Sequence, residues 1–330
     1  MRVLHIYQIE EGDLRKTGAE PSENVLRKAD WIDLSDATDD EKKTVESTLG
    51  ITLKAFNQYE PFQISSHYSA TKDQITMTGL LLICSGEKVP ELIKITFVRT
   101  KGVLVTVADG SSMSTLVREC ENSFSHKSSR DDVLATMLDM IVDHTDNILD
   151  KIGHDLDRIN TQVFQHHATT KRRRLLLGSP RLRNRQLERV LADLGPSREM
   201  LVKLRRSVLS FRRMIAFLRE QDIDKELEKK LETFERDLHS IAEAESDLSA
   251  TAGFLLDGVV GYIGLLQNKV MNVLTLVGVI LTPPIMVASI YGMNFKNIPE
   301  LNWNYGYAFA LGTMVVTSTV MYLWVRVRGL

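Results

Sequence analysis

The sequence predicts an α+β domain, an α/β sandwich, followed by a long stalk helix and a two-helix transmembrane hairpin. Residues 271–290 and 305–325 contain no Asp, Glu, Lys, Arg or His, and each reaches the roughly 20 residues that a helix needs to cross a bilayer. Runs of β-branched residues before residue 124 indicate strands. The absence of proline between Pro196 and Pro283 permits a very long helix.

Residues 1–128 are predicted to form the α/β domain. Strands are expected at 75–84, 91–100 and 103–109, which Gly and Pro residues separate. Residues 31–50 predict a short strand, then a helix capped by Asp36 or Thr38 and ended by Gly50. This domain shows no nucleophile elbow, no phosphate-binding glycine loop and no metal-ligand spacing, so we do not expect an enzyme.

The amino terminus and the cysteines indicate a cytoplasmic domain. MRVLHIYQIEEGDLRK has neither the apolar stretch nor the cleavage site of a signal peptide. The two cysteines, Cys84 and Cys120, are far apart in the sequence and are interpreted as reduced thiols. The net charge of -2 and the 25% of charged residues resemble those of a soluble protein, because about 270 polar-patterned residues dilute the two apolar runs.

Residues 129–220 are predicted to be helical and carry two charged clusters. An acidic stripe falls at steps of four, three, four and seven, which puts five carboxylates on one helix face: Asp139, Asp143, Asp146, Asp150 and Asp157. It is either a solvated face or a divalent-cation site. The histidines of this region, with no tight metal spacing, are interpreted as surface residues: His144, His154, His166 and His167.

A basic run, Lys171–Arg174 followed by Arg181, Arg183 and Arg185, raises the possibility of nucleic-acid binding. No aromatic residues interleave with it, and the whole chain is slightly acidic. We therefore expect no nucleic-acid partner, and interpret the run as a turn that faces solvent or anionic lipid.

Residues 221–270 are predicted to be a stalk helix that continues into the first crossing. Its apolar residues repeat at four, three, four and three, the spacing of a heptad seam: Leu227, Leu231, Phe234, Leu238 and Ile241. A single helix cannot bury such a seam alone, so it should pack against other helices or other copies.

Small and polar residues align along one face as this helix nears the membrane. They are Asp257, Gly261, Gly264, Asn268, Asn272, Thr275, Gly278, Thr282 and Ser289, with Ile285 or Met286 filling the remaining turn. One interpretation is a packing seam between the two crossings. The other, which we favour, is an ion path, because the stripe runs from a carboxylate to the turn after Ile290.

The turn Tyr291-Gly292-Met293-Asn294-Phe295 and the segment IPELNWNYGY (298–307) resemble the CorA magnesium transporter family. The hallmark of that family is Gly-Met-Asn at the end of the first of two crossings. The resemblance extends more loosely to WIDL (31–34) and LVTV (104–107). It implies a homopentameric funnel with a central pore, in which five first crossings line the pore and the second crossings face lipid.

The resemblance also implies roles for individual residues. The selectivity filter would be Gly292, Met293 and Asn294, with Glu300 in the loop raising the local cation concentration. Met271 and Leu274 would be constrictions, and Asn268 and Asp257 would meet the ion at the cytoplasmic mouth. The remaining pore-lining positions would be Thr275, Gly278, Thr282 and Ile285.

Transport of Mg²⁺, and of Co²⁺ and Ni²⁺, would be driven by the membrane potential without a cofactor. In the family, intracellular Mg²⁺ bound by carboxylates between cytoplasmic domains is thought to hold the pore shut. Thr233 stands where one such aspartate is expected, so we assign Mg²⁺ sensing to the neighbouring Glu232, Glu235 and Asp237.

The expected location is the cell inner membrane, with both termini in the cytoplasm. Lys269 precedes the first crossing and Arg326 and Arg328 follow the second, as the positive-inside rule requires. The expected segments are the α/β domain, the helical region, the stalk (221–270), the first crossing (271–291), the outer loop (292–304), the second crossing (305–325) and the tail (326–330).

Two alternatives remain open. The zinc-transporting branch of the same superfamily has a similar hairpin, although Met293 favours the magnesium branch. A membrane-anchored sensor or scaffold would use the hairpin only as a tether.

Overall fold

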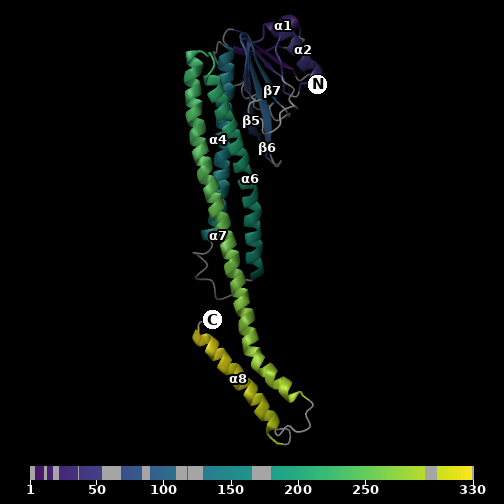
Figure 1. The fold of residues 1–330 in the computed structure, drawn as a ribbon, viewed down its shortest axis with the longest axis vertical. Helices are drawn as coiled ribbons and strands as arrows, with labels where there is room; N and C mark the ends of the chain where they lie inside the picture. The colour runs from purple at the N-terminus through teal and green to yellow at the C-terminus, as the bar shows by residue number, and fades with distance from the viewer. Residues whose placement is uncertain are drawn as a thin grey trace. The chain divides into compact units, whose positions relative to one another are not determined.

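In the computed structural model, the described residues are 4–10, 13–17, 22–35, 37–53, 68–83, 90–108, 117, 129–165, 180–293 and 303–328. The chain divides into two compact units, Met1–Leu255 and Leu256–Leu330. Helix α7 (Lys225–Tyr291) passes from the first unit into the second without a break (Figure 1). The predicted unbroken helix through residues 270 and 271 is therefore confirmed.

A seven-stranded sheet forms the centre of the first unit, in the order β2-β1-β3-β7-β6-β5-β4. Neighbouring strands are antiparallel except for β3 and β7, which are parallel. All three strands predicted between residues 75 and 109 are present to within one residue. The strands are β1 (His5–Glu10), β2 (Asp13–Lys16), β3 (Trp31–Asp33), β4 (Tyr68–Ala70), β5 (Gln74–Ile83), β6 (Glu91–Thr100) and β7 (Leu104–Ala108).

Helices α1 (Glu23–Arg27) and α2 (Asp39–Leu49) pack against β1, β3, β6 and β7 through a buried apolar cluster. Thr38 is the cap of α2: its hydroxyl accepts from the Glu41 N–H, and the Glu41 carboxylate accepts from the Thr38 N–H, which is a capping box. Gly50 ends the helix with a φ of 64°, a conformation that glycine adopts without strain. Both predicted boundaries are confirmed, and Asp36 lies outside the described residues.

The parallel pair joins the two segments WIDL and LVTV. The indole N–H of Trp31 donates to the Thr106 hydroxyl (3.1 Å), which donates to Asp33 Oδ1 (2.8 Å). Burial raises the pKa of Asp33, and hydrogen bonds from Ser35 and Thr106 oppose that shift. The two segments are therefore held together by a buried polar network rather than by apolar packing alone.

Helices α4 (Arg130–Asn160) and α6 (Pro180–Arg219) pack together beside the sheet and cover the edge of β5 that β4 leaves unpaired. A π-helical turn, η3 (Thr161–Gln165), follows α4. Ser210 of α6 accepts from the Leu80 N–H (2.8 Å), and His144 Nε2 of α4 donates to the Leu82 carbonyl (3.0 Å). Covering an exposed edge prevents pairing with another chain.

The prediction that His144 is an ordinary surface histidine is therefore wrong, because its ring is half-buried and bonds to β5. His154 is exposed, as predicted, and His166 and His167 lie outside the described residues. The same is true of Cys84, Cys120 and Lys171–Arg174.

The first half of α7 packs on α4, and its predicted heptad seam is buried. Leu227, Leu231, Phe234, Leu238 and Ile241 are each at most 5% exposed. Further along, a Cβ on Gly153 of α4 would lie 3.8 Å from the Leu248 side chain, which places the two helices in contact.

The seam contains one carboxylate. The heptad spacing continues from Ile241 to Glu245 and then Leu248, and Glu245 is only 3% exposed. Its carboxylate accepts a hydrogen bond from the Ser249 hydroxyl, one turn along the same helix (2.8 Å). A carboxylate at such a position lowers packing stability, because burial removes its hydration.

Replacing Glu245 with Leu is expected to stabilise the first unit by about 1–2 kcal/mol, because a buried charge gives way to an apolar side chain at an apolar position. Thermal unfolding of the full chain in detergent should show a melting temperature a few degrees higher. The control is Ser249→Ala, which removes the hydroxyl partner and should lower stability by about 1 kcal/mol. A lower melting temperature for Glu245→Leu would contradict this interpretation.

The second unit consists of the rest of α7 and helix α8 (Gly306–Arg328). Both helices are long and apolar enough to cross a membrane, and the most apolar stretch of α7 has no residue buried inside the chain. Helix α8 continues past the predicted end at 325, so Arg326 and Arg328 lie in its last turn. The Arg328 guanidinium stacks over the Trp324 ring at 4.4 Å.

Candidate functional site

The predicted pore-lining residues of α7 share one exposed face of the helix. At 3.6 residues per turn they fall within about 120° of its circumference. Met271, Leu274 and Ile285 are 59%, 61% and 60% exposed, which is unusual for apolar side chains unless lipid, water or another chain covers them. The other members of this face are also exposed: Asp257, Asn268, Thr275, Gly278 and Thr282.

Helix α8 packs on the opposite side of α7. The half-buried residues of this part of α7 include Leu276, Ile280, Pro284 and Val287, which lie roughly opposite the polar stripe on the helix circumference. A Cβ added to Gly278 would meet nothing within 4 Å. The stripe is therefore not the seam between the two crossings, and that interpretation is wrong.

One of the two carbonyls freed by the proline pair within α7 receives a donor from α8. Pro284 has no N–H, so the carbonyl of Ile280 loses its helical partner. The Ser318 hydroxyl of α8 donates to that carbonyl at 3.4 Å. A freed carbonyl inside the bilayer needs such a donor, because lipid supplies none. The hydrogen bond therefore ties α8 to α7 beside the proline pair.

Ser318→Ala is expected to weaken the hairpin by about 1 kcal/mol, because it leaves the Ile280 carbonyl without a donor. Thermal unfolding in detergent should show a lower melting temperature than the wild type. The matched control is Thr319→Ala, at the next position, where the hydroxyl bonds only to Val315 of its own helix (2.7 Å). Equal effects of the two substitutions would show that Ser318 has no special role.

The turn after α7 is tight. The Gly292 N–H donates to the Ala288 carbonyl (2.9 Å), and the Met293 N–H donates to the Ile290 carbonyl (3.2 Å). A Cβ on Gly292 would lie 3.1 Å from the Ala288 oxygen, so any other residue would force the backbone to shift by a few tenths of an ångström. Gly292 and Met293 are exposed, whereas Asn294 and Glu300 lie outside the described residues.

The three predicted regulatory carboxylates have different surroundings. Glu232 and Glu235 both form ion pairs with Arg219, at the end of α6. Asp237 is exposed and faces α4. On that helix the pKa of Asp146 is raised, first by burial and then by the charges of Asp150, Asp143 and Asp237. Within the part of the chain that the structure describes, no three His, Cys, Asp or Glu side chains are grouped to hold a metal ion.

The acidic stripe of α4 is exposed at all five positions. The structure therefore places it on a solvent-facing side of the helix, beside Asp237 of α7.

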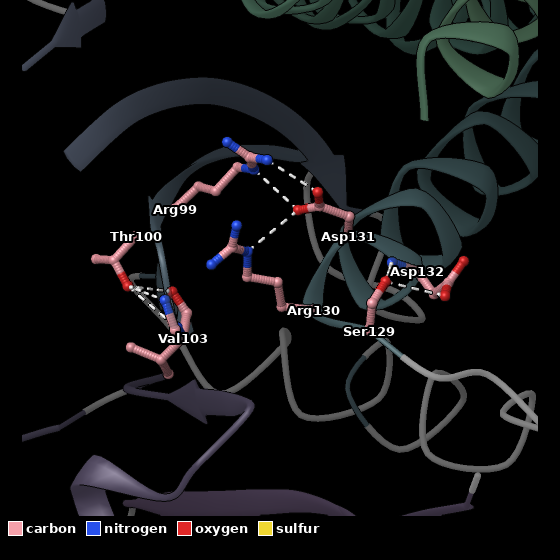
Figure 2. Close-up of polar contacts among 8 residues, drawn as sticks. Arg99, Thr100, Val103, Ser129, Arg130, Asp131 and Asp132 are labelled. Atoms are coloured by element: carbon pink, nitrogen blue, oxygen red, sulfur yellow. Dashed lines mark hydrogen bonds and ion pairs between the residues drawn. The ribbon is translucent and has the colours of Figure 1, made fainter. Parts of the chain in front are cut away.

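An ion-pair network connects the sheet to α4 and α7. Arg99 of β6 binds both carboxylate oxygens of Asp131 at 2.8 Å, and Arg130 contacts the same carboxylate at 3.4 Å (Figure 2). The next residue, Asp132, accepts from Lys230 of α7 (2.8 Å). Sequence patterns could not reveal these pairs, because the partners lie 32 and 98 residues apart.

A family model described as "CorA-like Mg2+ transporter protein" matches residues 27–326. The chain therefore belongs to the CorA family. A relative from this family, the magnesium transport protein CorA of Mannheimia succiniciproducens, is 23% identical over 330 residues. The alignment covers 99% of this chain and 99% of the relative.

Solved structures give the same fold. The CorA magnesium transporter from Methanocaldococcus jannaschii aligns with a TM-score of 0.72 at 17% identity, covering 99% of this chain and 98% of that one. The ZntB cytoplasmic domain from Vibrio parahaemolyticus aligns with a TM-score of 0.55 at 11% identity, covering 80% of this chain and 99% of that one. The soluble fold is thus common to proteins named for CorA and for ZntB. Members of the CorA family are transporters rather than enzymes.

Proposed function

We propose that the protein carries Mg²⁺, and also Co²⁺ and Ni²⁺, into the cytoplasm through a pore lined by the polar face of α7 from five copies. The observation that supports this most strongly is the open face itself. The stripe from Asp257 to Ile285 is exposed on the side of α7 away from α8. An exposed polar stripe along an apolar helix is costly in lipid unless it borders water or protein.

The proposed filter is formed by Gly292, Met293 and Asn294, because Mg²⁺ loses its water shell reluctantly. Neutral carbonyl and amide oxygens can hydrogen-bond to the waters of a hydrated ion. They also bind it weakly enough to release it. Glu300 would raise the local cation concentration, Met271 and Leu274 would close the pore by excluding water, and Asn268 and Asp257 would meet the ion at the cytoplasmic end.

The membrane potential drives the ion in this proposal. A divalent cation moving through -100 mV gains about 4.6 kcal/mol, twice the single-charge value. No cofactor is required, and Mg²⁺ is the cargo. The inner-membrane location, the cytoplasmic termini and the division into stalk, crossings and loop belong to the same proposal.

Regulation by intracellular Mg²⁺ is proposed for the carboxylates near residue 233. Asp237 is the best placed of the three, because it is exposed and lies near other carboxylates. Glu232 and Glu235 would have to leave Arg219 in order to bind an ion.

Flux in liposomes tests the proposal. The purified protein is reconstituted with an internal Mg²⁺ indicator, and an inside-negative potential is imposed. We expect Mg²⁺ uptake that follows the potential and needs no proton gradient. Zn²⁺ uptake coupled to a proton gradient, without Mg²⁺ uptake, would favour the zinc branch. No flux of any divalent cation would favour a membrane-anchored sensor or scaffold.

A further inference from the structure

In the helical bundle of the first unit, one group of exposed aspartates and one group of exposed arginines lie on different helices. Four exposed aspartates lie together on α4 and α7: Asp143, Asp146, Asp150 and Asp237. Among the described residues none of these four forms an ion pair, and their mutual repulsion contributes to the raised pKa of Asp146. We name these four residues the acidic face; no described Lys, Arg or His forms an ion pair with it.

Between residues 198 and 213, the exposed charged residues of α6 are four arginines and Glu199, which pairs with Lys203. Four of its arginines are exposed and make no ion pair with any described residue: Arg198, Arg205, Arg206 and Arg213. Val202 and Leu209 lie between them and are 50% and 44% exposed. An apolar centre with arginines around it is typical of a protein interface, where arginine is enriched and other charges are depleted. We name this set the arginine face.

Both faces lie at the same level of the bundle. Ser210 of α6 and His144 of α4 are fixed to Leu80 and Leu82, two residues apart on the same edge of β5. The arginines from 205 to 213 therefore lie at the same height along the bundle as Asp143 and Asp146. Helix α6 lies beside α4 in the bundle (Figure 1).

We propose that the acidic face of one copy docks against the arginine face of a second copy. The two faces are different surfaces of one chain, so the contact is heterologous, and repeated rotation closes such a contact into a ring. Because the two faces lie at the same height along the bundle, neighbouring copies can make the contact without a translation along the helix axes. A closed ring requires this. A bound cation alone would leave the arginines and the exposed Val202 and Leu209 unexplained, whereas a second copy accounts for both faces. Mg²⁺ bound at Asp237, as proposed above, would compete with the arginines for the same carboxylates.

This inference rests on the proposed function only in assuming that the ring is the pore-forming assembly. Its test is charge reversal in the full chain in detergent, with oligomeric mass measured against protein and salt concentration. The acidic-face variant is Asp146→Arg with Asp150→Arg, and the arginine-face variant is Arg205→Asp with Arg206→Asp. The matched control, Glu228→Arg with Lys229→Asp, reverses two exposed charges of α7 outside both faces.

We expect each face variant to raise the dissociation constant of the oligomer about tenfold or more, because like charges then meet across the contact. Combining all four substitutions restores opposite charges and should return the constant to within about threefold of the wild type. The control should leave it unchanged. If a charge reversal prevents folding, the neutralising variant Arg205→Gln with Arg206→Gln takes its place. It should raise the dissociation constant by a smaller factor.

The inference is overturned if the single-face variants assemble like the wild type, if the combined variant is no better than either alone, or if the wild type is monomeric. Mg²⁺ flux separates this result from the proposed function. If the wild type conducts Mg²⁺ and the charge-reversed variants assemble like the wild type, only the docking contact is disproved. If the wild type does not conduct but the combined variant restores assembly, only the transport proposal is disproved.

Discussion

Asn294→Ala is expected to lower Mg²⁺ flux by at least about tenfold while the oligomer remains intact. Each copy in the proposed ring offers one Asn294 amide oxygen to the water shell of the ion, so the substitution removes the whole ring of acceptors at once. Losing one hydrogen bond to a charged group costs about 1.5–3 kcal/mol, and a ring loses several. The measurement is potential-driven Mg²⁺ uptake by liposomes, with oligomeric mass determined on the same preparation.

The matched control for this substitution is Asn297→Ala, which removes the same amide three residues further along the loop. It should retain most of the flux. The filter assignment fails if Asn294→Ala conducts like the wild type, or if both substitutions reduce flux equally. Loss of assembly in Asn294→Ala alone would instead give the residue a structural role.

Arg99→Ala is expected to destabilise the first unit by about 3 kcal/mol, the largest stability effect we predict. The Arg99 and Asp131 side chains are 11% and 17% exposed, and both carboxylate oxygens are bound. Removing the arginine leaves a largely buried carboxylate with only Arg130 beside it. Arg99→Lys should recover less than half of the loss, because lysine cannot form the two-pronged contact.

The control pair is Lys101 and Asp73, which are 81% and 79% exposed at 2.9 Å. Lys101→Ala should change the free energy of unfolding by less than about 1 kcal/mol, because solvent screens exposed pairs. Denaturant unfolding of the full chain in detergent compares the two substitutions. Similar losses for both would contradict the structural role of the Arg99 pair.

The same pair predicts a pH dependence. Burial acts to raise the pKa of Asp131, but the hydrogen bond and charge of Arg99, with Arg130, lower it below the ordinary value of 3.8. A carboxyl group with a lowered folded-state pKa contributes stability above its unfolded pKa and loses it as the pH falls through the folded value. The stability difference between wild type and Arg99→Ala should therefore be full at neutral pH and shrink below pH 3.8.

Local patterns were sufficient to predict the helices, the main strands and the heptad seam. The Thr38 cap and the Gly50 stop depend on residues within one or two helical turns, so both helix boundaries can be predicted from the sequence. The seam from Leu227 to Ile241 depends only on spacing. The exposed face of α7 was likewise predicted from spacing, although only the position of α8 decided that it is not a packing seam.

Contacts between distant elements could not be predicted. His144 has the spacing of a surface residue, and only the unpaired edge of β5 draws it inward. The short connection between α6 and α7 brings the two helix ends together, and this is the one signal in the sequence for the pairing of Glu232 and Glu235 with Arg219. The Arg99 pair joins a strand to a helix 32 residues further along the chain, and no local pattern predicts it.

The most direct test of the central claim asks whether the polar face of α7 borders water. Single cysteines are placed at Gly278 and Thr282 on this face, and at Leu276 and Val287 on the side towards α8, in a chain whose Cys84 and Cys120 are serine. A water-soluble cationic thiol reagent is added to proteoliposomes. We expect rapid labelling and block of Mg²⁺ flux at 278 and 282, with neither at 276 and 287. Labelling only at 276 and 287, or equal labelling at all four, would contradict it.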